Sequence, residues 1–219
     1  MYDQNSPGWL KLLERRLGWL AIPQISILLV TLQAVGFLFI MSNPAWSLQL
    51  ALLPDAVLAG EYWRVITFLA LPLSMSPLWL FFALWFIYSI VNSLESEWGS
   101  FRTTFYVLIS ILLTIGFSLL TGYPVLSVKH FEASLFLAAA MLFPEMEIRL
   151  FFAIPAKLKW MGWLTGVMVL LEAVKGTWLD RFYLMVIYSN FLIFFGPVAL
   201  SRARQIIRKK RYQSKIDRD

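Results

Sequence analysis

Long apolar stretches recur along this 219-residue chain, and short polar segments separate them. A helix needs about 20 mostly apolar residues to cross the hydrocarbon core of a bilayer. The alternating pattern of a membrane β-strand is absent, so helices must satisfy the backbone hydrogen bonds in lipid. The sequence therefore predicts an all-α polytopic membrane protein with six transmembrane helices. The expected spans are residues 22–41, 78–92, 103–120, 131–143, 160–173 and 182–200.

The composition agrees with a membrane protein and excludes several kinds of site. Hydrophobic residues make up 59% of the chain and charged residues 15%, whereas about one quarter of a soluble domain is charged. The chain has no cysteine, which excludes disulfides, cysteine-bound zinc and a cysteine nucleophile. Its single histidine, His130, excludes a multi-histidine metal site. No phosphate-binding loop or G-x-G-x-x-G motif is present, so we expect no metal and no cofactor.

Basic residues gather on one side of the predicted spans. Residues 201–219 hold eight Lys or Arg and two Asp, which accounts for the net charge of +6 of the whole chain. Fifteen of the 19 Lys and Arg residues fall in segments on one side of a six-span topology, as is typical of cytoplasmic segments. Both termini are therefore expected in the cytoplasm. We expect the basic tail to contact anionic lipids and not nucleic acid.

Two further segments have interfacial character. In residues 1–20 the apolar side chains share one face of a helix, which predicts a cytoplasmic amphipathic helix in the membrane interface. The first loop, residues 43–77, has apolar pieces that are too short to span, and we expect a partly helical hairpin in the outer interface. The chain thus divides into this amphipathic segment, a six-helix membrane domain over residues 21–200 and the basic tail 201–219.

Three motifs stand in the first loop, after the second span and at the fourth span. The first, G-x-x-W-R-x-x-T, contains Trp63 and Arg64, and the second, L-E-x-x-x-G-S-x-R, contains Glu95 and Gly99. In the third, Ser134 stands one residue inside the expected start of an apolar helix, which is followed by P-x-x-x-I-x-L-F-F-x-x-P-x-K-x-K-W. Together and in this order, they resemble the motifs of the rhomboid family of intramembrane proteases and of the related derlins. The resemblance implies a six-helix rhomboid-like bundle.

The first two motifs are expected to have structural roles. Arg64 can donate hydrogen bonds to carbonyl groups of its own loop, while Trp63 anchors the loop at the membrane interface. Glu95 can pair with Arg102 or accept hydrogen bonds at a helix N-terminus.

The resemblance also implies what a protease of this family requires. A serine on the fourth span attacks the amide, a histidine on the sixth span takes its proton, and donors on the second span hold the oxyanion. Ser134 matches the serine, but Glu132 and Leu135 replace the glycines of the family motif. The sixth span contains no histidine, and the matching position falls on Ser189, beside Asn190. The second span offers no comparable donor.

The chain therefore resembles a rhomboid pseudoprotease. We predict that it binds transmembrane segments of client membrane proteins without cleaving them, in quality control, degradation or trafficking. Ser134, Ser189 and Asn190 would form a polar notch for the client helix, and a membrane protease would be a further partner. The tail lacks the glycine-rich ATPase-binding motif of derlins, which favours a bacterial inner membrane over the ER membrane.

Two alternatives remain open. The chain would be an atypical intramembrane serine protease if Ser134 were activated by His130, which precedes it by four residues, or by Glu132. It would be a small transporter if a buried charge served a transported ion, and Glu172 is expected to be the only acidic residue well inside a span.

Overall fold

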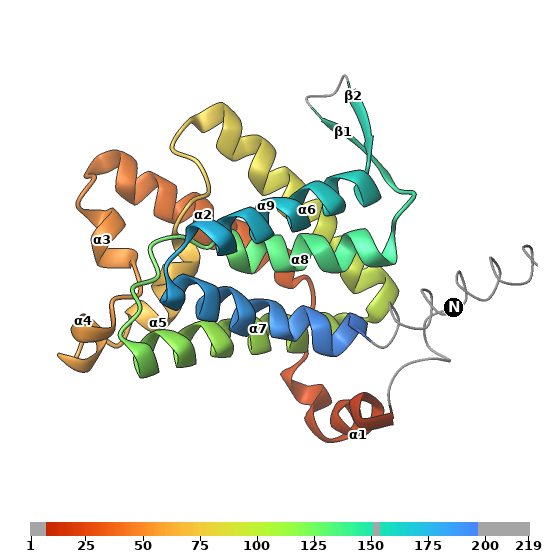
Figure 1. Cartoon of the computed structure of the whole chain (residues 1–219), viewed down its shortest axis with the longest axis horizontal. Helices are drawn as coiled ribbons and strands as arrows, with labels where there is room; N and C mark the ends of the chain where they lie inside the picture. Colours follow the sequence, from red (N-terminus) through yellow and green to blue (C-terminus); the bar gives the residue numbers. More distant parts are fainter. Residues whose placement is uncertain (1–7, 151–153, 197–219) are drawn as a thin grey trace, which may run out of the picture.

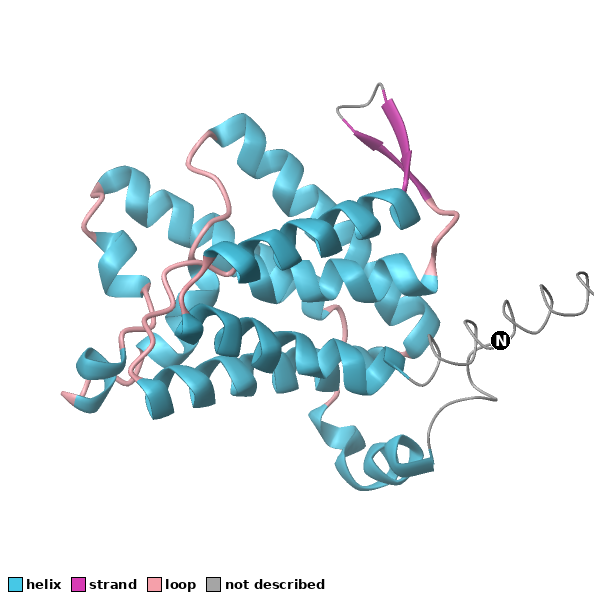
Figure 2. Ribbon diagram, in the orientation of Figure 1, coloured by secondary structure: helices cyan, strands magenta, loops and turns pink. Residues whose placement is uncertain are grey.

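The computed structural model describes residues 8–150 and 154–196, and this part of the chain is mostly helical (Figure 2). Among the described residues, four helices are long and apolar enough to cross a membrane. They are α2 (Ile25–Ser42), α6 (Pro77–Trp98), α7 (Ser100–Thr121) and the last described helix, Trp178–Gly196. They correspond to the first, second, third and sixth predicted spans, and they agree with a helical membrane protein.

The fourth and fifth predicted spans form the helices α8 (Lys129–Leu142) and α9 (Leu158–Lys175). α8 has only 14 residues, and α9 includes three charged side chains, so neither is both long and apolar enough to span on its own. α8 nevertheless lies inside the bundle, packed against α6, α7 and α9 (Figure 1). A Cβ added at Gly162 of α9 would lie 2.8 Å from the Ala140 Cβ of α8, whereas one at Gly166 would meet nothing within 4 Å. Gly162 therefore packs α9 against α8 of the same chain.

α6 continues beyond the predicted end of its span, as far as Trp98, and Gly99 then separates it from α7. Gly99 has a φ of 83°, in the left-handed region that glycine adopts without steric cost. Glu95 accepts hydrogen bonds from the Gln24 backbone N–H (2.9 Å) and from the Ser100 hydroxyl (2.6 Å). Its carboxylate thereby connects the α6–α7 turn to the start of α2.

The amphipathic helix α1 (Gly8–Leu17) and the short 3-10 helix η2 (Gly18–Leu20) lie beside this turn. Arg102, one of the two partners expected for Glu95, pairs with Glu14 of α1 at 3.1 Å. The Thr104 hydroxyl accepts a hydrogen bond from the Ile22 N–H at 3.0 Å and so fixes the entry to α2. The predicted tail, residues 201–219, lies outside the described residues.

The first loop folds into short helices at one end of the bundle (Figure 1). These are α3 (Trp46–Leu50), α4 (Pro54–Leu58), α5 (Arg64–Thr67) and the 3-10 helix η3 (Phe68–Ala70). As its motif predicts, Arg64 donates to the carbonyl oxygens of Leu48 and Ala51, the latter at 2.9 Å, and it pairs with Glu61 at 2.6 Å. Trp63 beside it is exposed. The expectation of a partly helical loop is confirmed.

Two contacts fix this loop to the rest of the fold. The backbone of Leu52 pairs with that of Val125 in an isolated bridge, with N–H to O distances of 3.2 and 2.9 Å. On the bundle side, Gly36 of α2 lies directly against η3, and a Cβ at this position would be 1.8 Å from the Ala70 carbonyl oxygen. Only glycine allows this close approach.

The segment between α8 and α9 forms an antiparallel hairpin of β1 (Glu147–Leu150) and β2 (Ile154–Lys157), which the sequence did not predict. It lies at the end of the bundle opposite the first loop (Figure 1). Glu145 pairs with Lys157 at 3.0 Å and with Lys159 at 2.6 Å. The hydrogen bonds from Lys159 and Lys157 hold the pKa of the Glu145 carboxyl below its usual value. The segment between the fourth and fifth predicted spans thus contains two paired strands.

Candidate functional site

α8 is a buried helix that carries polar side chains on opposite sides. His130, Glu132 and Ser134 occupy alternate positions, and all three are buried. Because successive residues of a helix are about 100° apart, His130 and Ser134 share one side and Glu132 lies on the opposite side. The expectation that Ser134 stands one residue inside the helix start is wrong. The polar residues before it are already helical, so the serine lies in the second turn.

The Ser134 hydroxyl is enclosed in a small polar cluster. It is fully buried and lies 2.6 Å from the Tyr106 hydroxyl of α7, which also donates to the Ser134 carbonyl oxygen at 3.2 Å. The Asn190 amide, from the last helix, donates to the Tyr106 carbonyl oxygen (2.9 Å) and to the Ser110 hydroxyl (2.7 Å). The cluster therefore joins α7, α8 and the last helix by hydrogen bonds between buried groups.

This cluster includes two of the three residues expected to form the client notch. Ser134 and Asn190 both contact Tyr106, whereas the Ser189 hydroxyl donates to the Val186 carbonyl oxygen of its own helix at 2.6 Å. Sequence reasoning missed Tyr106, although a tyrosine in the middle of an apolar span needs a partner for its hydroxyl and is a signal of such a contact.

His130 lies on the same side of α8 as Ser134 but has other neighbours. Its Nε2 is 3.5 Å from a Glu172 carboxylate oxygen of α9, and its ring packs edge-on against Tyr183 and Tyr188, with centroid distances of 5.7 and 6.3 Å. Within the described part of the chain, no hydrogen bond joins His130 to Ser134. The structure thus gives the histidine a carboxylate partner without assembling a Ser134–His130 pair.

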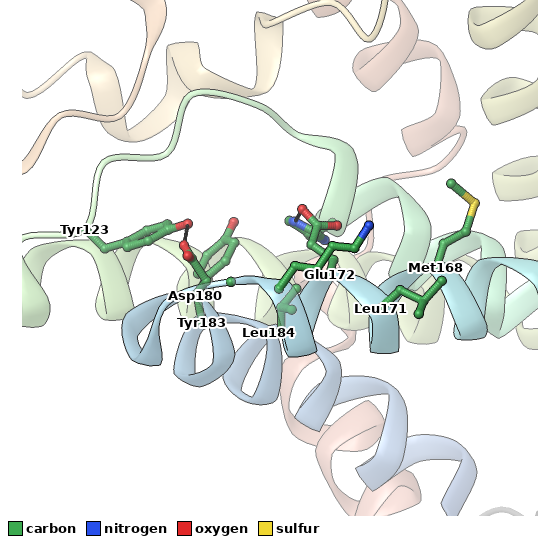
Figure 3. A pocket seen from close by; sticks show the side chains of 10 residues that line it. Tyr123, Met168, Leu171, Glu172, Asp180, Tyr183 and Leu184 are labelled. Carbon is green, nitrogen blue, oxygen red and sulfur yellow. Dashed lines mark hydrogen bonds and ion pairs between the residues drawn. The ribbon is translucent and has the colours of Figure 1, made fainter.

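A pocket of about 530 Å³ lies around His130, between α8, α9 and the last helix (Figure 3). In it the Tyr123 hydroxyl donates to an Asp180 carboxylate oxygen at 2.7 Å (Figure 3). Burial, together with the hydrogen bond to Asp180, raises the pKa of Tyr123 to about 12. Glu172 forms an ion pair with Lys129, and Lys175 also lines the pocket. Acidic, basic and apolar side chains thus all line this pocket.

Asp180 also determines where the last helix begins. Its carboxylate accepts hydrogen bonds from the Thr177 N–H (2.8 Å) and hydroxyl (2.7 Å), and the Thr177 hydroxyl accepts one from the Asp180 N–H (3.3 Å). This reciprocal pattern over three residues is a capping box, and it satisfies N–H groups that a helix start leaves without partners. Asp180 therefore has a structural role that accounts for its place in the pocket.

Glu132 pairs with Gln33 on the opposite side of α8. The Gln33 amide nitrogen, from α2, donates to a Glu132 carboxylate oxygen, and both side chains are buried. Glu132 is buried among the helices, whereas the side chain of Glu172, which was expected to be the acidic residue well inside a span, is 41% exposed. The Gln33 partner of Glu132 lies 99 residues away in the sequence.

Glu132 also lines a second pocket, of about 280 Å³, between α6, α8 and α9. Most of its wall is apolar and comes from α6 and α8. Among the described residues, no group of three or more His, Cys, Asp or Glu side chains could hold a metal ion. Comparisons of the chain with protein-family models, with curated proteins and with solved structures find no match.

Proposed function

We propose that this protein is a rhomboid-like pseudoprotease, a six-span bundle that binds transmembrane segments of client membrane proteins without cleaving them. The proposal begins from three motifs of the sequence that resemble those of the rhomboid family and stand in the same order. The structure adds physical support at the serine, at the two ends of the bundle and at the surface between α6 and α9.

The observation that carries the proposal is the environment of Ser134. A serine nucleophile needs a base to accept its proton and donors to hold the oxyanion. The Ser134 hydroxyl instead faces the hydroxyl of Tyr106, and within the described part of the chain no histidine or carboxylate bonds to it. A neutral phenol is a poor base near neutral pH. Ser134 therefore acts as a hydrogen-bonding residue of the core and not as a nucleophile.

The arrangement of the bundle supports six spans. The first loop and the β1–β2 hairpin lie at opposite ends of the bundle (Figure 1), as segments on opposite sides of a membrane would. α8 has 14 residues and rises about 21 Å, less than the roughly 30 Å of a hydrocarbon core. Because α8 is surrounded by longer helices, it does not need to reach both surfaces. A short central helix and an interfacial first loop favour a locally thinned bilayer, in which a client helix is less well solvated.

α9 supplies the surface for a client. It packs against α8 and β2, and it leaves large apolar side chains exposed, among them Trp163, Leu164 and Leu170. The second pocket lies between this helix and α6. A client helix that packs along the Thr165 side of α9 would bring its side chains to this pocket.

The proposed location is a bacterial inner membrane, with both termini in the cytoplasm. The basic residues of the tail, each contributing about 1 kcal/mol near an anionic surface, would hold it at the lipid headgroups. A membrane protease that receives the bound client is the partner expected on this proposal.

The 3.5 Å approach of His130 to Glu172 favours one alternative, an atypical serine protease. A histidine oriented by a carboxylate is two thirds of a catalytic triad. For this activity Ser134 would have to leave Tyr106 and bond to His130.

A fluorophosphonate serine probe separates the two functions. The pseudoprotease predicts no labelling of the folded protein in detergent, and no cleavage of a rhomboid substrate after reconstitution. Labelling and cleavage that disappear in Ser134→Ala would refute the pseudoprotease and establish the alternative. Binding is tested separately, by photo-crosslinking of the full chain to single-spanning proteins in native membranes.

A further inference from the structure

A polar pocket of about 550 Å³ lies between α1 and the turn that joins α6 to α7. It shares no lining residue with the pockets around His130 and Glu132. The charged side chains that line it are three cations and two carboxylates: Lys11, Arg15, Arg102, Glu14 and Glu97. Lys11, Glu14 and Arg15 stand three and four residues apart, so they share one face of α1.

The cations of this pocket are only partly neutralised. Arg102 pairs with Glu14 at 3.1 Å, and this ion pair joins α7 to α1. The exposed side chains of Lys11 and Arg15 have no hydrogen bond or ion pair with any other described residue, and neither has that of Glu97. Two free cations therefore share the pocket with one free carboxylate. The pocket keeps a positive charge that is available to an anion.

The position of α1 brings this charge to the membrane surface. The helix lies beside the bundle at the end that holds the hairpin, away from the first loop (Figure 1). Leu12 of α1 and Trp19 of η2 expose large apolar side chains, as a helix in the interface does toward the acyl chains. On the topology proposed above this end is cytoplasmic, and the cytoplasmic leaflet carries anionic lipids. The pocket is therefore at the level of their headgroups.

We propose that this pocket binds the headgroup of an anionic phospholipid, and that Lys11 and Arg15 contact its phosphate. The guanidinium of Arg15 offers paired N–H donors that match phosphate oxygens, and Lys11 adds a second charge. Basic pockets beside membrane helices on the cytoplasmic side suit such headgroups. The bound lipid would hold α1 against the α6–α7 turn, in addition to the ion pair of Glu14 with Arg102. The inference goes beyond the proposed function, because it depends on the topology and not on client binding.

The test uses the full-length protein, reconstituted in phosphatidylcholine nanodiscs with a small fraction of photo-reactive phosphatidylglycerol. The reactive group stands at the glycerol end of an acyl chain, and the crosslinked peptides are identified by mass spectrometry. We expect crosslinks on α1 and on the α6–α7 turn. A phosphatidylcholine with the same reactive group should label these segments at least about threefold less, because its headgroup has no net charge.

Two pairs of variants examine the cause of this labelling. Arg15→Gln should lower it about three- to tenfold, whereas Arg16→Gln, a matched change in an exposed arginine that does not line the pocket, should have little effect. Glu97→Gln should raise the labelling, because it removes the free carboxylate of the pocket. Glu147→Gln, in an exposed carboxylate of the hairpin, should leave it unchanged. Arg15 and Glu97 have no partner among the described residues, so these changes should not disturb the fold.

The possible results are distinct. Equal losses for Arg15→Gln and Arg16→Gln would show a diffuse attraction to the membrane and overturn the site. Crosslinks confined to residues 201–219, or equal labelling by the phosphatidylcholine probe, would overturn it as well. Inorganic phosphate, at the ionic strength of a chloride control, should leave the labelling unchanged; its loss would mean that the pocket takes soluble phosphate and not a lipid. Client binding is decided separately, by the crosslinking to single-spanning proteins described above.

Discussion

Replacing Arg64 by alanine should be among the most destabilising changes in the first loop. Arg64 is 6% exposed, and its guanidinium donates to the carbonyl oxygens of Leu48 and Ala51 and pairs with Glu61. A hydrogen bond from a charged group contributes about 1.5–3 kcal/mol, and loss of the arginine would leave both carbonyls without this donor. Two such bonds predict a loss of about 3–6 kcal/mol in the free energy of unfolding. Arg64→Lys should recover only part of this loss. The lysine ammonium keeps the charge and N–H donors, but it cannot reproduce the planar arrangement of donors in the guanidinium.

Arg181 provides a matched control, because it has the same chemistry at an exposed position. It donates to the carbonyl oxygens of Ala173 (2.9 Å) and Val174 (3.2 Å) at the end of α9. Water can replace an exposed donor, so Arg181→Ala should cost less than about 1 kcal/mol.

The measurement is reversible unfolding of the purified protein in mixed micelles by titration with a denaturing detergent, followed by the fluorescence of its 10 tryptophans. The reasoning predicts a loss for Arg64→Ala several times that for Arg181→Ala. Equal losses for the two variants would refute it, because burial would then have no part in the effect. A loss below about 1 kcal/mol for Arg64→Ala would show that the loop carbonyls find other donors.

Three further substitutions test the packing of the bundle, each by thermal unfolding in detergent. Gly36→Ala should cost about 1–3 kcal/mol, because its Cβ would overlap the carbonyl of η3, whereas Gly116→Ala meets nothing within 4 Å and should be neutral or stabilising. Gly162→Ala should lower stability and Gly166→Ala should not, if α9 packs through the first glycine alone; equal effects would point to a second packing surface. Tyr106→Phe should cost about 1–3 kcal/mol by leaving the buried serine without its partner, and a neutral effect would contradict the cluster.

The parts of the fold that depend on local sequence were predictable. Hydropathy located α2, α6, α7 and the last helix, because a run of apolar residues of spanning length leaves the backbone few alternatives to a helix. The role of Arg64 was also predictable, since a cation in a loop of short apolar pieces has carbonyl groups close along the chain, 13 and 16 residues away. The glycine pair of α9 indicated close packing, but only the structure shows that Gly162 contacts its own α8.

Contacts between distant segments were not predictable from periodicity or composition. The β1–β2 hairpin arises from backbone pairing of two four-residue segments, of which β1 (EIRL) alternates charged and apolar residues but β2 (IPAK) does not. The burial of Glu132 depends on Gln33, and the enclosure of Ser134 depends on Tyr106, 28 residues earlier. In each case the neighbouring residues in the sequence do not determine whether the side chain is buried or exposed. The partner on another helix determines it.

The place of α8 in the bundle explains why its polar side chains have partners on neighbouring helices. Since α8 is enclosed by other helices, each polar side chain needs a partner from a neighbour: Ser134 has Tyr106 on α7, and His130 has Glu172 on α9. Glu132 has Gln33 on α2, and its second oxygen has no donor among the described residues. Each of these three polar side chains thus joins α8 to a different neighbouring helix, and the enclosed serine is part of the scaffold.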